Sequence, residues 1–289
     1  MIHSTAIIEE GAVVGNDIEV GPFCVIGKNV KLGDRVKLVS HVVIDGDTVI
    51  GDDTVIYPFA SVGIKSQDLK FQEDDQMTGV RIGKRCKIRE YVTIHQGTPA
   101  SRGTVSTMHG HVALKQDSST PLGTIIGNDC QVMVNAHIAH DCVLGNNVVL
   151  SNLVQLAGHV EVGDFAIISA GSAVHQFCTI GESAFLGALS ATAVDIPPYV
   201  IYEGMPARYR TINKLGLTRR GFTPEDMQAV HLVYSEILNG DPSIELGVKI
   251  SKLRKKLKDN QYAMNALDFI EKRSGRGITA GAKAAYQRD

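Results

Sequence analysis

The stretch Asn135-Ala136-His137-Ile138-Ala139-His140-Asp141-Cys142 belongs to a longer segment, residues 126–192, in which an aliphatic residue recurs at every sixth position. The recurring residues are Ile126, Val132, Ile138, Leu144, Leu150, Leu156, Val162, Ile168, Val174, Ile180 and Leu186. A period of six fits neither an α-helix nor an alternating strand, but it fits a solenoid whose sides are each one short strand and one corner. Glycine follows the aliphatic residue at intervals of eighteen, at Gly127, Gly145, Gly163 and Gly181. This spacing predicts a three-sided coil with one corner that needs a permissive backbone.

The same period begins at the first residues of the chain and is interrupted twice. Aliphatic residues hold every sixth place from Ile2 to Val62, and the period returns at Ile82, Ile88 and Ile94. Residues 64–79 and 96–123 lack the period and are polar or rich in Ser, Thr, Gly and Pro. Such interruptions are usually loops on one face of a solenoid, where binding residues tend to lie. We therefore expect a parallel β-solenoid domain, residues 1–195, with two loop excursions.

The five cysteines all take one place in the repeat, four residues after a repeat aliphatic. They are Cys24, Cys86, Cys130, Cys142 and Cys178. Elsewhere the same place holds other small residues, such as Ala6 and Ala12, so it is predicted to be a narrow slot that points inward. We expect these cysteines to be buried spacers rather than disulfides, metal ligands or nucleophiles.

Composition restricts the class of protein. The 289 residues are 44% hydrophobic and include no Trp, which suits a narrow interior filled by aliphatic side chains. No apolar run is long enough to span a bilayer, and the N-terminus enters the repeat without a basic and apolar leader. We expect a cytoplasmic protein with no stable membrane insertion.

The C-terminal part, residues 196–289, is predicted to be an α-helical domain. Pro197-Pro198 is expected to end the solenoid. Three helices are then predicted, one capped by Thr223 with Pro224 in its first turn, one from Ser243, and one that contains Leu267.

Charge divides along the same boundary. Residues 1–194 carry 13 basic and 20 acidic side chains, a net charge of −7, whereas residues 195–289 carry 16 and 11, a net charge of +5. The basic part is compatible with a solvated helix face or with a docking surface for an acidic protein or a phosphate-bearing ligand. No nucleic-acid-binding module is visible, so nucleic acid is not an expected partner.

Several histidines are candidates for chemistry. His140 has Asp141 beside it and His137 three residues before it, and His159 and His175 follow His140 by 19 and 35 residues. Because successive coils lie roughly 4.8 Å apart, we expect His140, His159 and His175 to form a ladder along one edge. One neutral imidazole of the ladder would suit a general base that acts on a hydroxyl. Alternatively, His137, His140 and His159 would offer three nitrogen ligands to Zn²⁺.

Several motifs, taken with the repeat, resemble those of the UDP-N-acetylglucosamine O-acyltransferase family, which catalyses the first step of lipid A synthesis. The motifs are Gln67-Asp68-Leu69-Lys70, residues 135–142, Leu156-Ala157-Gly158-His159-Val160, Ala173-Val174-His175-Gln176-Phe177-Cys178, Pro197-Pro198-Tyr199-Val200-Ile201 and Arg219-Arg220-Gly221-Phe222. They occur in the order of the family over nearly the whole chain. This order is far more specific than a hexapeptide repeat, which many acyltransferases share.

The resemblance implies a left-handed β-helix, a homotrimer and active sites in clefts between neighbouring prisms. It also implies transfer of an (R)-3-hydroxyacyl group from acyl carrier protein to the 3-position of UDP-N-acetylglucosamine, with no cofactor and no metal. His140 matches the general base of the family, and Asp141 is expected to orient or charge its imidazole. Gly158 stands one coil after His140 and matches the backbone N–H donor to the developing oxyanion.

Other residues match the substrate contacts of the family. These are Gln67, Asp68, Lys70, His137, His159, His175 and Gln176 in the cleft, and Asn213, Arg219 and Arg220 near the nucleotide and the carrier protein. The strongly acidic carrier protein is the partner that the basic C-terminal part would take. Two features depart from the family, since the loop of residues 96–123 is longer than expected and Ala188 replaces the glycine that gauges chain length in long-chain members. We expect a medium to long acyl chain, and a 3-amino acceptor sugar remains an alternative.

Three other readings compete with the O-acyltransferase. The related N-acyltransferase of the same pathway carries a uridine-binding domain before its repeats, whereas the repeat here starts at Ile2. A zinc-dependent carbonic anhydrase of the same fold would use the histidines as ligands. A non-enzymatic repeat scaffold gives no reason for the spacing of the histidines.

Overall fold

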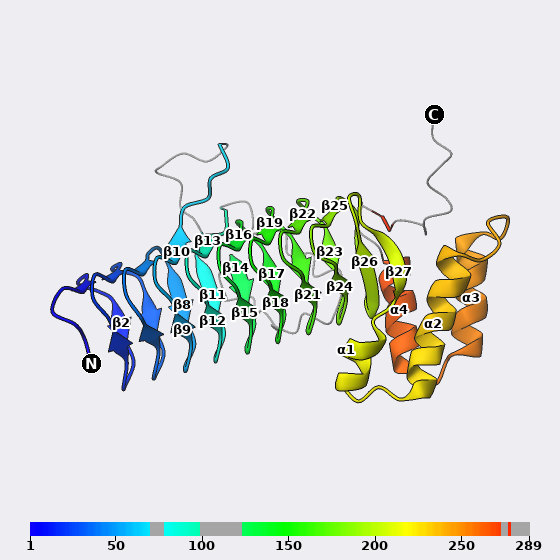
Figure 1. Cartoon of the computed structure of the whole chain (residues 1–289), viewed down its shortest axis with the longest axis horizontal. Helices are drawn as coiled ribbons and strands as arrows, with labels where there is room; N and C mark the ends of the chain where they lie inside the picture. Colours follow the sequence, from blue (N-terminus) through cyan, green and yellow to red (C-terminus); the bar gives the residue numbers. More distant parts are fainter. Residues whose placement is uncertain (70–77, 99–122, 273–276, 279–289) are drawn as a thin grey trace.

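The computed structural model describes residues 1–69, 78–98, 123–272 and 277–278. Short strands stack coil upon coil into a prism with three sheets of mainly parallel strands (Figure 1). The prism is the left-handed parallel β-helix that the family resemblance implies. The first sheet contains β1 (Ile7–Ile8), β4 (Val25–Ile26), β7 (Val43–Ile44), β10 (Ser61–Ile64), β13 (Thr93–His95), β16 (His137–Ile138), β19 (Gln155–Leu156), β22 (Ala173–Val174) and β25 (Ala191–Thr192).

The other two sheets complete each coil. The second sheet contains β2 (Val13–Val14), β5 (Lys31–Leu32), β8 (Thr48–Ile50), β11 (Val80–Ile82), β14 (Thr124–Ile126), β17 (Val143–Leu144), β20 (Glu161–Val162) and β23 (Thr179–Ile180). The third sheet contains β3 (Glu19–Val20), β6 (Lys37–Leu38), β9 (Val55–Ile56), β12 (Lys87–Ile88), β15 (Gln131–Val132), β18 (Val149–Leu150), β21 (Ile167–Ile168), β24 (Phe185–Leu186), β26 (Val200–Glu203) and β27 (Arg208–Ile212).

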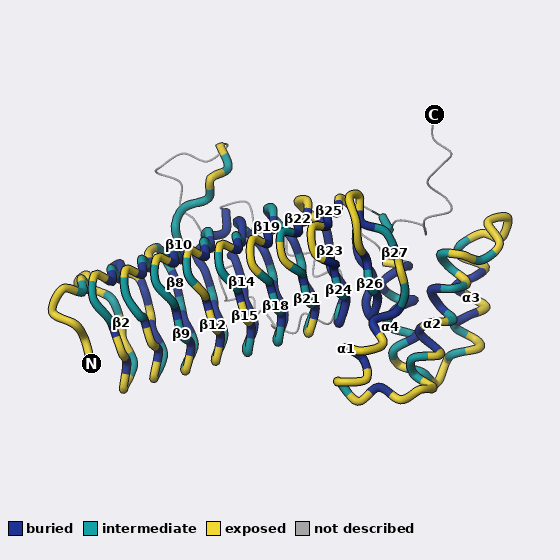
Figure 2. Tube along the Cα trace, in the orientation of Figure 1, coloured by how far each residue is buried: buried dark blue, intermediate teal, exposed yellow. Residues whose placement is uncertain are grey.

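The repeat aliphatics form the core of the prism. In β15, for example, Val132 is fully buried while Gln131 is exposed, and the same alternation recurs in most strands (Figure 2). All five cysteines are free and buried, as predicted. Near the N-terminus, Ile2 is 49% exposed because the first coil has a neighbour on one side only.

The permissive corner lies elsewhere than the glycine spacing predicts. The left-handed backbone conformation is found two residues after those glycines, at Asp129, Asn147, Phe165 and Ser183. The glycines themselves are required by close approach of the next coil, since a Cβ on Gly127 would lie 2.4 Å from the carbonyl oxygen of Gly145. The prediction was therefore right about the spacing and wrong about its cause.

The solenoid continues beyond Pro197-Pro198, contrary to the predicted end. Strand β26 pairs in parallel with β24, and β27 then returns antiparallel to β26. The prolines are tolerated because they precede β26 and so remove no hydrogen bond from the sheet itself. This hairpin was not predicted from the sequence.

In the described part of the chain, four helices follow the hairpin: α1 (Lys214–Arg219), α2 (Pro224–Leu238), α3 (Leu246–Lys256) and α4 (Gln261–Glu271). Helix α2 begins as predicted, with a capping box between Thr223 and Asp226. Helix α3 begins later than predicted because the N–H and hydroxyl of Ser243 both donate to Asp241 and form a turn. The short α1 was not predicted.

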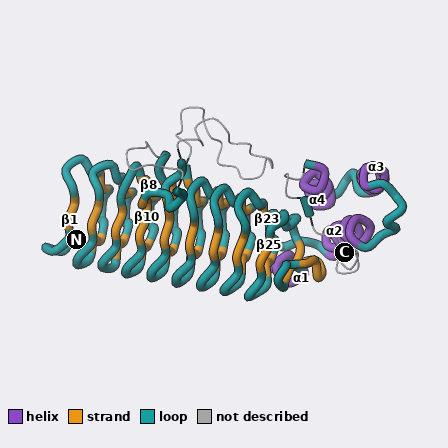
Figure 3. Tube along the Cα trace, turned by 90° about the horizontal axis from the view of Figure 1, so that it is seen from above, coloured by secondary structure: helices purple, strands orange, loops and turns teal. Residues whose placement is uncertain are grey.

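The helical part stands at the C-terminal end of the prism (Figure 3). Helix α2 packs against α3, α4 and β27, and the buried Tyr234 of α2 donates a hydrogen bond to the carbonyl of Pro198 over 2.8 Å. Within the described ranges, the helices are too short or too polar to cross a membrane.

Candidate active site

An open groove of about 910 Å³ runs along the outer surface of the first sheet. Seven predicted site residues line it: Gln67, Asp68, His137, His140, Gly158, His175 and Gln176. The remaining lining residues are mostly small or apolar, namely Ala139, Gln155, Leu156, Ala157, Ala173, Val174, Ala191, Thr192, Ala193, Met205 and Pro206. Asp68 lies near His140 at one end of the groove, and mostly small or apolar residues continue along the sheet to Met205 and Pro206 of the hairpin.

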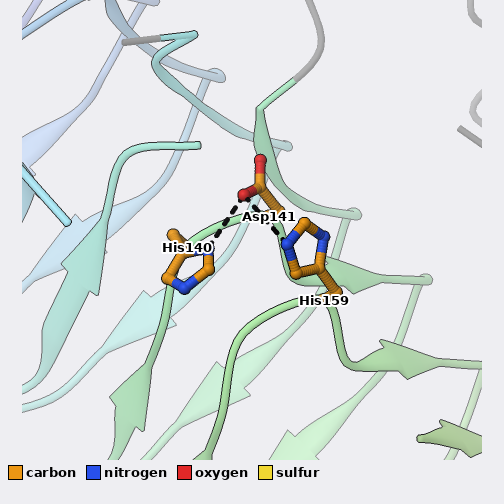
Figure 4. A group of neighbouring side chains, drawn as sticks. All are labelled: His140, Asp141 and His159. Carbon is orange, nitrogen blue, oxygen red and sulfur yellow. Dashed lines mark hydrogen bonds and ion pairs between the residues drawn. The ribbon is translucent and has the colours of Figure 1, made fainter. Parts of the chain in front are cut away.

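His140 and Asp141 form a hydrogen-bonded pair at a corner of the prism (Figure 4). The distance from His140 Nδ1 to Asp141 Oδ2 is 2.8 Å. Side chains of adjacent strand residues would point apart, but both residues lie in a turn after β16, and Asp141 has a left-handed backbone with φ of 59°. The corner therefore brings a carboxylate and an imidazole together that a strand would separate.

Asp141 is fixed by residues at both ends of the second loop excursion. The backbone N–H of Thr98 donates to Asp141 Oδ1 over 2.9 Å and its hydroxyl donates to Oδ2 over 2.8 Å, while the Asp141 N–H donates to the Thr124 hydroxyl. Burial would raise the pKa of Asp141, but the hydrogen bonds from His140 and Thr98 outweigh it and lower the pKa below its usual value. The carboxylate is therefore ionised at neutral pH.

The other edge of the His140 ring faces the groove. His140 Nε2 is 3.9 Å from Asp68 Oδ2, and the His140 side chain is only 12% exposed. Gly158 lies against the ring, since a Cβ added to it would lie 2.5 Å from both Cε1 and Nε2 of His140. Among the described residues, the N–H of Gly158 has no hydrogen-bond acceptor. Glycine is thus required here by the close approach of the imidazole.

His159 contacts the pair, but the predicted three-histidine ladder is wrong. The rings of His140 and His159 are 5.1 Å apart, and His159 Nε2 is 3.6 Å from Asp141 Oδ2. The next ring along this edge is Phe177, which stacks on His159 with centroids 4.6 Å apart. Because the coil repeat is eighteen residues, His159 follows Asp141 in register, and His175 occupies an earlier place in its coil.

The rings of His95 and His137 form a second histidine contact, in addition to that of His140 with His159. The Oγ1 of Thr93 and Nδ1 of His137 are 2.7 Å apart, and the rings of His95 and His137 meet edge to face with centroids 4.8 Å apart. Burial, with a smaller effect of His137, lowers the pKa of His95 to about 4, and burial also lowers the pKa of His137. Both rings are therefore neutral at pH 7. Sequence reasoning missed His95, although its place directly after Ile94, at the start of the second break, was a usable signal.

A potential metal-ligand cluster also differs from the predicted one. In the described ranges, the ligand atoms of His140, Asp141 and His159 all lie within 4.8 Å of one another. His137 is engaged with Thr93 instead, because it lies on the strand face and not at the corner.

The chain matches known proteins over nearly its full length. The bacterial transferase hexapeptide profile matches residues 11–46 and 123–158, and the profile described as UDP N-acetylglucosamine O-acyltransferase, domain 2, matches residues 195–279. A protein of Aliivibrio fischeri (strain MJ11), named acyl-(acyl-carrier-protein)–UDP-N-acetylglucosamine O-acyltransferase, is 46% identical over 278 residues, which cover 96% of this chain and 97% of that protein. The chain belongs to the UDP-N-acetylglucosamine O-acyltransferase family.

Two further relatives agree with this assignment. The protein of the same name from Sinorhizobium fredii (strain NBRC 101917 / NGR234) is 42% identical over 279 residues, 96% of this chain and 95% of the relative. The crystal structure of UDP-N-acetylglucosamine acyltransferase from Francisella novicida superposes with a TM-score of 0.85 at 34% identity, with 100% of both chains covered.

Two residues that match substrate contacts of the O-acyltransferase family, Asn213 and Arg220, do not line the groove of their own chain. The buried Asn213 caps α1 by accepting from the Gly216 N–H, and it donates to the carbonyl of Ser183 over 3.0 Å. Arg220 pairs with Glu182 over 2.7 Å and lies 3.8 Å from the ring centroid of Phe165.

The remaining predicted residues have separate surroundings. Arg219 is exposed at the end of α1. Ala188 lines a second cavity of about 480 Å³ beside the hairpin, which shares Pro206 with the groove. Lys70 lies outside the described residues.

Proposed function

We propose that this protein transfers an (R)-3-hydroxyacyl group from acyl carrier protein to the 3-hydroxyl of UDP-N-acetylglucosamine, with His140 as general base. Membership of the O-acyltransferase family supports the class of reaction. The assignment of the base depends on one observation, the hydrogen bond between His140 Nδ1 and Asp141.

This hydrogen bond determines the tautomer of His140. An ionised carboxylate can only accept hydrogen bonds, so the proton of the neutral imidazole lies on Nδ1. The lone pair of His140 is then on Nε2, the nitrogen that lies 3.9 Å from Asp68. A base with its lone pair directed into the groove can remove a proton from a bound sugar hydroxyl.

The proposed reaction proceeds in two proton transfers. The sugar oxygen attacks the thioester carbonyl as His140 Nε2 takes the hydroxyl proton, and Asp141 stabilises the imidazolium that forms. Negative charge develops on the carbonyl oxygen, where the N–H of Gly158 would donate a hydrogen bond worth roughly 3 kcal/mol. When the carbon–sulfur bond breaks, the leaving thiolate takes the proton from Nε2, and His140 returns to its neutral form.

The polar lining residues would hold the acceptor, and the apolar surface would hold the acyl chain. We assign Gln67, Asp68 and Gln176 to the sugar and its neighbouring groups, together with His137, His159 and His175. The alanine-rich surface that ends at Met205 and Pro206 suits a hydrocarbon chain. A chain of medium to long length is the expected donor.

We propose a homotrimer in which the groove is completed by a neighbouring copy. This arrangement would account for the positions of Arg219 and Arg220 outside the groove of their own chain, because each copy would present them to a neighbour, while the buried Asn213 would hold α1 in place. For the acidic carrier protein, helix α3 offers exposed cations at Lys252 and Lys255.

The decisive experiment is an acyl-transfer assay with a panel of 3-hydroxyacyl chain lengths on carrier protein. UDP-N-acetylglucosamine and its 3-amino analogue would be offered as competing acceptors, and the products identified by mass spectrometry. We expect an ester product on UDP-N-acetylglucosamine. Transfer only to the amino analogue would correct the acceptor, and absence of transfer with every donor would refute the proposed function. An assay of protein freed of metal by a chelator distinguishes the zinc-dependent carbonic anhydrase, because acyl transfer would survive removal of the metal whereas hydration of carbon dioxide would not.

A further inference from the structure

Three possible metal ligands converge at the corner where His140 lies. His140 Nδ1 and His159 Nε2 approach the same atom, Asp141 Oδ2, at 2.8 Å and 3.6 Å (Figure 4). His140 and Asp141 come from one coil and His159 from the next, so the cluster is built on stacked coils. We call these three residues the corner cluster.

The corner cluster has the composition of a transition-metal site. Two imidazoles and one carboxylate are a donor set of catalytic zinc sites, with ligand bonds of about 2.0–2.2 Å. Around a tetrahedral ion, such bonds place neighbouring ligand atoms roughly 3.4 Å apart. The pair of Asp141 and His159 is already near this spacing, whereas His140 must withdraw from Asp141 by about 0.6 Å.

The surroundings support coordination as well. Thr98 donates to both oxygens of Asp141, and such outer hydrogen bonds orient a ligating carboxylate. The His159 side chain is 33% exposed, so an ion and one or more water ligands can reach the cluster from solvent. A divalent metal of borderline softness, such as Zn²⁺, suits imidazole nitrogen better than Mg²⁺ or Ca²⁺ does.

We propose that the corner cluster is a reversible, inhibitory site for Zn²⁺. Coordination requires the lone pair of His140 Nδ1, so the proton that Nδ1 carries must move to Nε2. The ring stays neutral overall, and the proton balance of the protein is unchanged. His140 then presents an N–H to the groove where the reaction needs a lone pair. Zn²⁺ therefore stops proton abstraction by fixing the wrong tautomer, a fault that is able to reduce turnover by about 10⁴-fold in a serine protease.

The binding of metal does not depend on the proposed function. The expected loss of activity does rest on the proposed function. Binding is measured first, with untagged, full-length protein freed of metal by a chelator. Co²⁺ serves as the probe because its visible absorption reports tetrahedral nitrogen and oxygen ligands, and Zn²⁺ is then added to displace it. We expect one equivalent of Co²⁺ to bind with a tetrahedral spectrum.

Two variants separate the corner cluster from other histidines. His159→Gln removes one ligand and is expected to weaken binding at least tenfold. His41→Gln, which removes an exposed histidine from another corner of the prism, is expected to bind Co²⁺ like the parent. Equal binding by the parent and His159→Gln, loss of binding in His41→Gln, or an absence of binding to the parent would overturn the site.

Activity is the second measurement. In the acyl-transfer assay, Zn²⁺ should lower kcat of the parent and of His41→Gln over the concentration range in which it displaces Co²⁺, and a chelator should restore it. Full turnover with the cluster loaded would refute the inhibitory role while leaving the metal site intact. A protein that binds Co²⁺ as expected but transfers no acyl group before zinc is added would instead refute the proposed function.

Discussion

Replacing Gly158 by alanine tests the contact on which the geometry of His140 depends. The added Cβ would lie 2.5 Å from Cε1 and Nε2 of His140, whereas carbon atoms in contact ordinarily lie about 3.5–4.0 Å apart. The ring must therefore retreat by about 1 Å. A displacement of this size at a reacting group costs about 10²-fold in rate, equivalent to about 2.7 kcal/mol of transition-state stabilisation.

Stability should change much less than activity. The backbone of Gly158 is not in the left-handed region, so alanine introduces no backbone strain there. The main cost is a weakened hydrogen bond between His140 and Asp141, worth about 1 kcal/mol. Gly247→Ala is the matched control, because nothing lies within 4 Å of its added Cβ in α3. The control should gain up to about 1 kcal/mol of helix stability and keep full activity.

The assay compares kcat/KM for acyl transfer and the melting temperature of the parent and both variants. Gly158→Ala should lose about two orders of magnitude in kcat/KM while melting within a few degrees of the parent. Activity within threefold of the parent would mean that the His140 ring is not held against Gly158 during turnover, or that it is not the base. A large fall in melting temperature would assign the glycine to folding rather than to catalysis.

Four other variants test further parts of the structure. His140→Ala should lose most acyl transfer yet melt like the parent, and a large fall in its melting temperature would instead indicate a structural histidine. Arg220→Ala should destabilise the protein by about 1–2 kcal/mol because it removes a half-buried ion pair and a cation–π contact, and a melting curve equal to that of the parent would contradict this role. Replacing the exposed Arg219 by alanine should leave the melting curve unchanged and raise KM for carrier protein or nucleotide sugar. Unchanged kinetics would contradict a role of Arg219 in substrate binding. The folded-state pKa of His95, about 4, is below its ordinary value of 6.5, so the unfolded chain binds the proton first, and the free energy of unfolding falls by on the order of 3 kcal/mol as pH drops from about 6.5 towards 4. Denaturant titrations across this range should therefore show a smaller change in the free energy of unfolding for His95→Phe than for the parent. An equal change in both proteins would disprove the contribution of His95.

Local, repeated features of this protein could be predicted from sequence. Beyond the first coil, the sixth-residue aliphatics and the five cysteines are buried because strand alternation and a constant coil length give each position the same environment. The capping box of α2 and the adjacency of His140 to Asp141 are also local. Gly158 could be placed against His140 because it lies one coil repeat further along the chain.

Features that depend on distant residues required the tertiary structure. The hydrogen bond from Thr98 to Asp141 joins residues that are 43 positions apart, on either side of a loop excursion of irregular length. No sequence period therefore relates Thr98 to Asp141. The predicted ladder failed because His175 lies two residues before the place in register with His159, and such a shift at a corner changes the direction of a side chain. Phe177 occupies that place instead. Strand β26 formed after two prolines because an exposed edge of the third sheet was available to pair with it. The sequence determined the repeating coil and suggested His140 as the base that we propose. Packing between coils decided which groups from other coils touch His140, since those contacts arise only when separate turns of the chain are stacked.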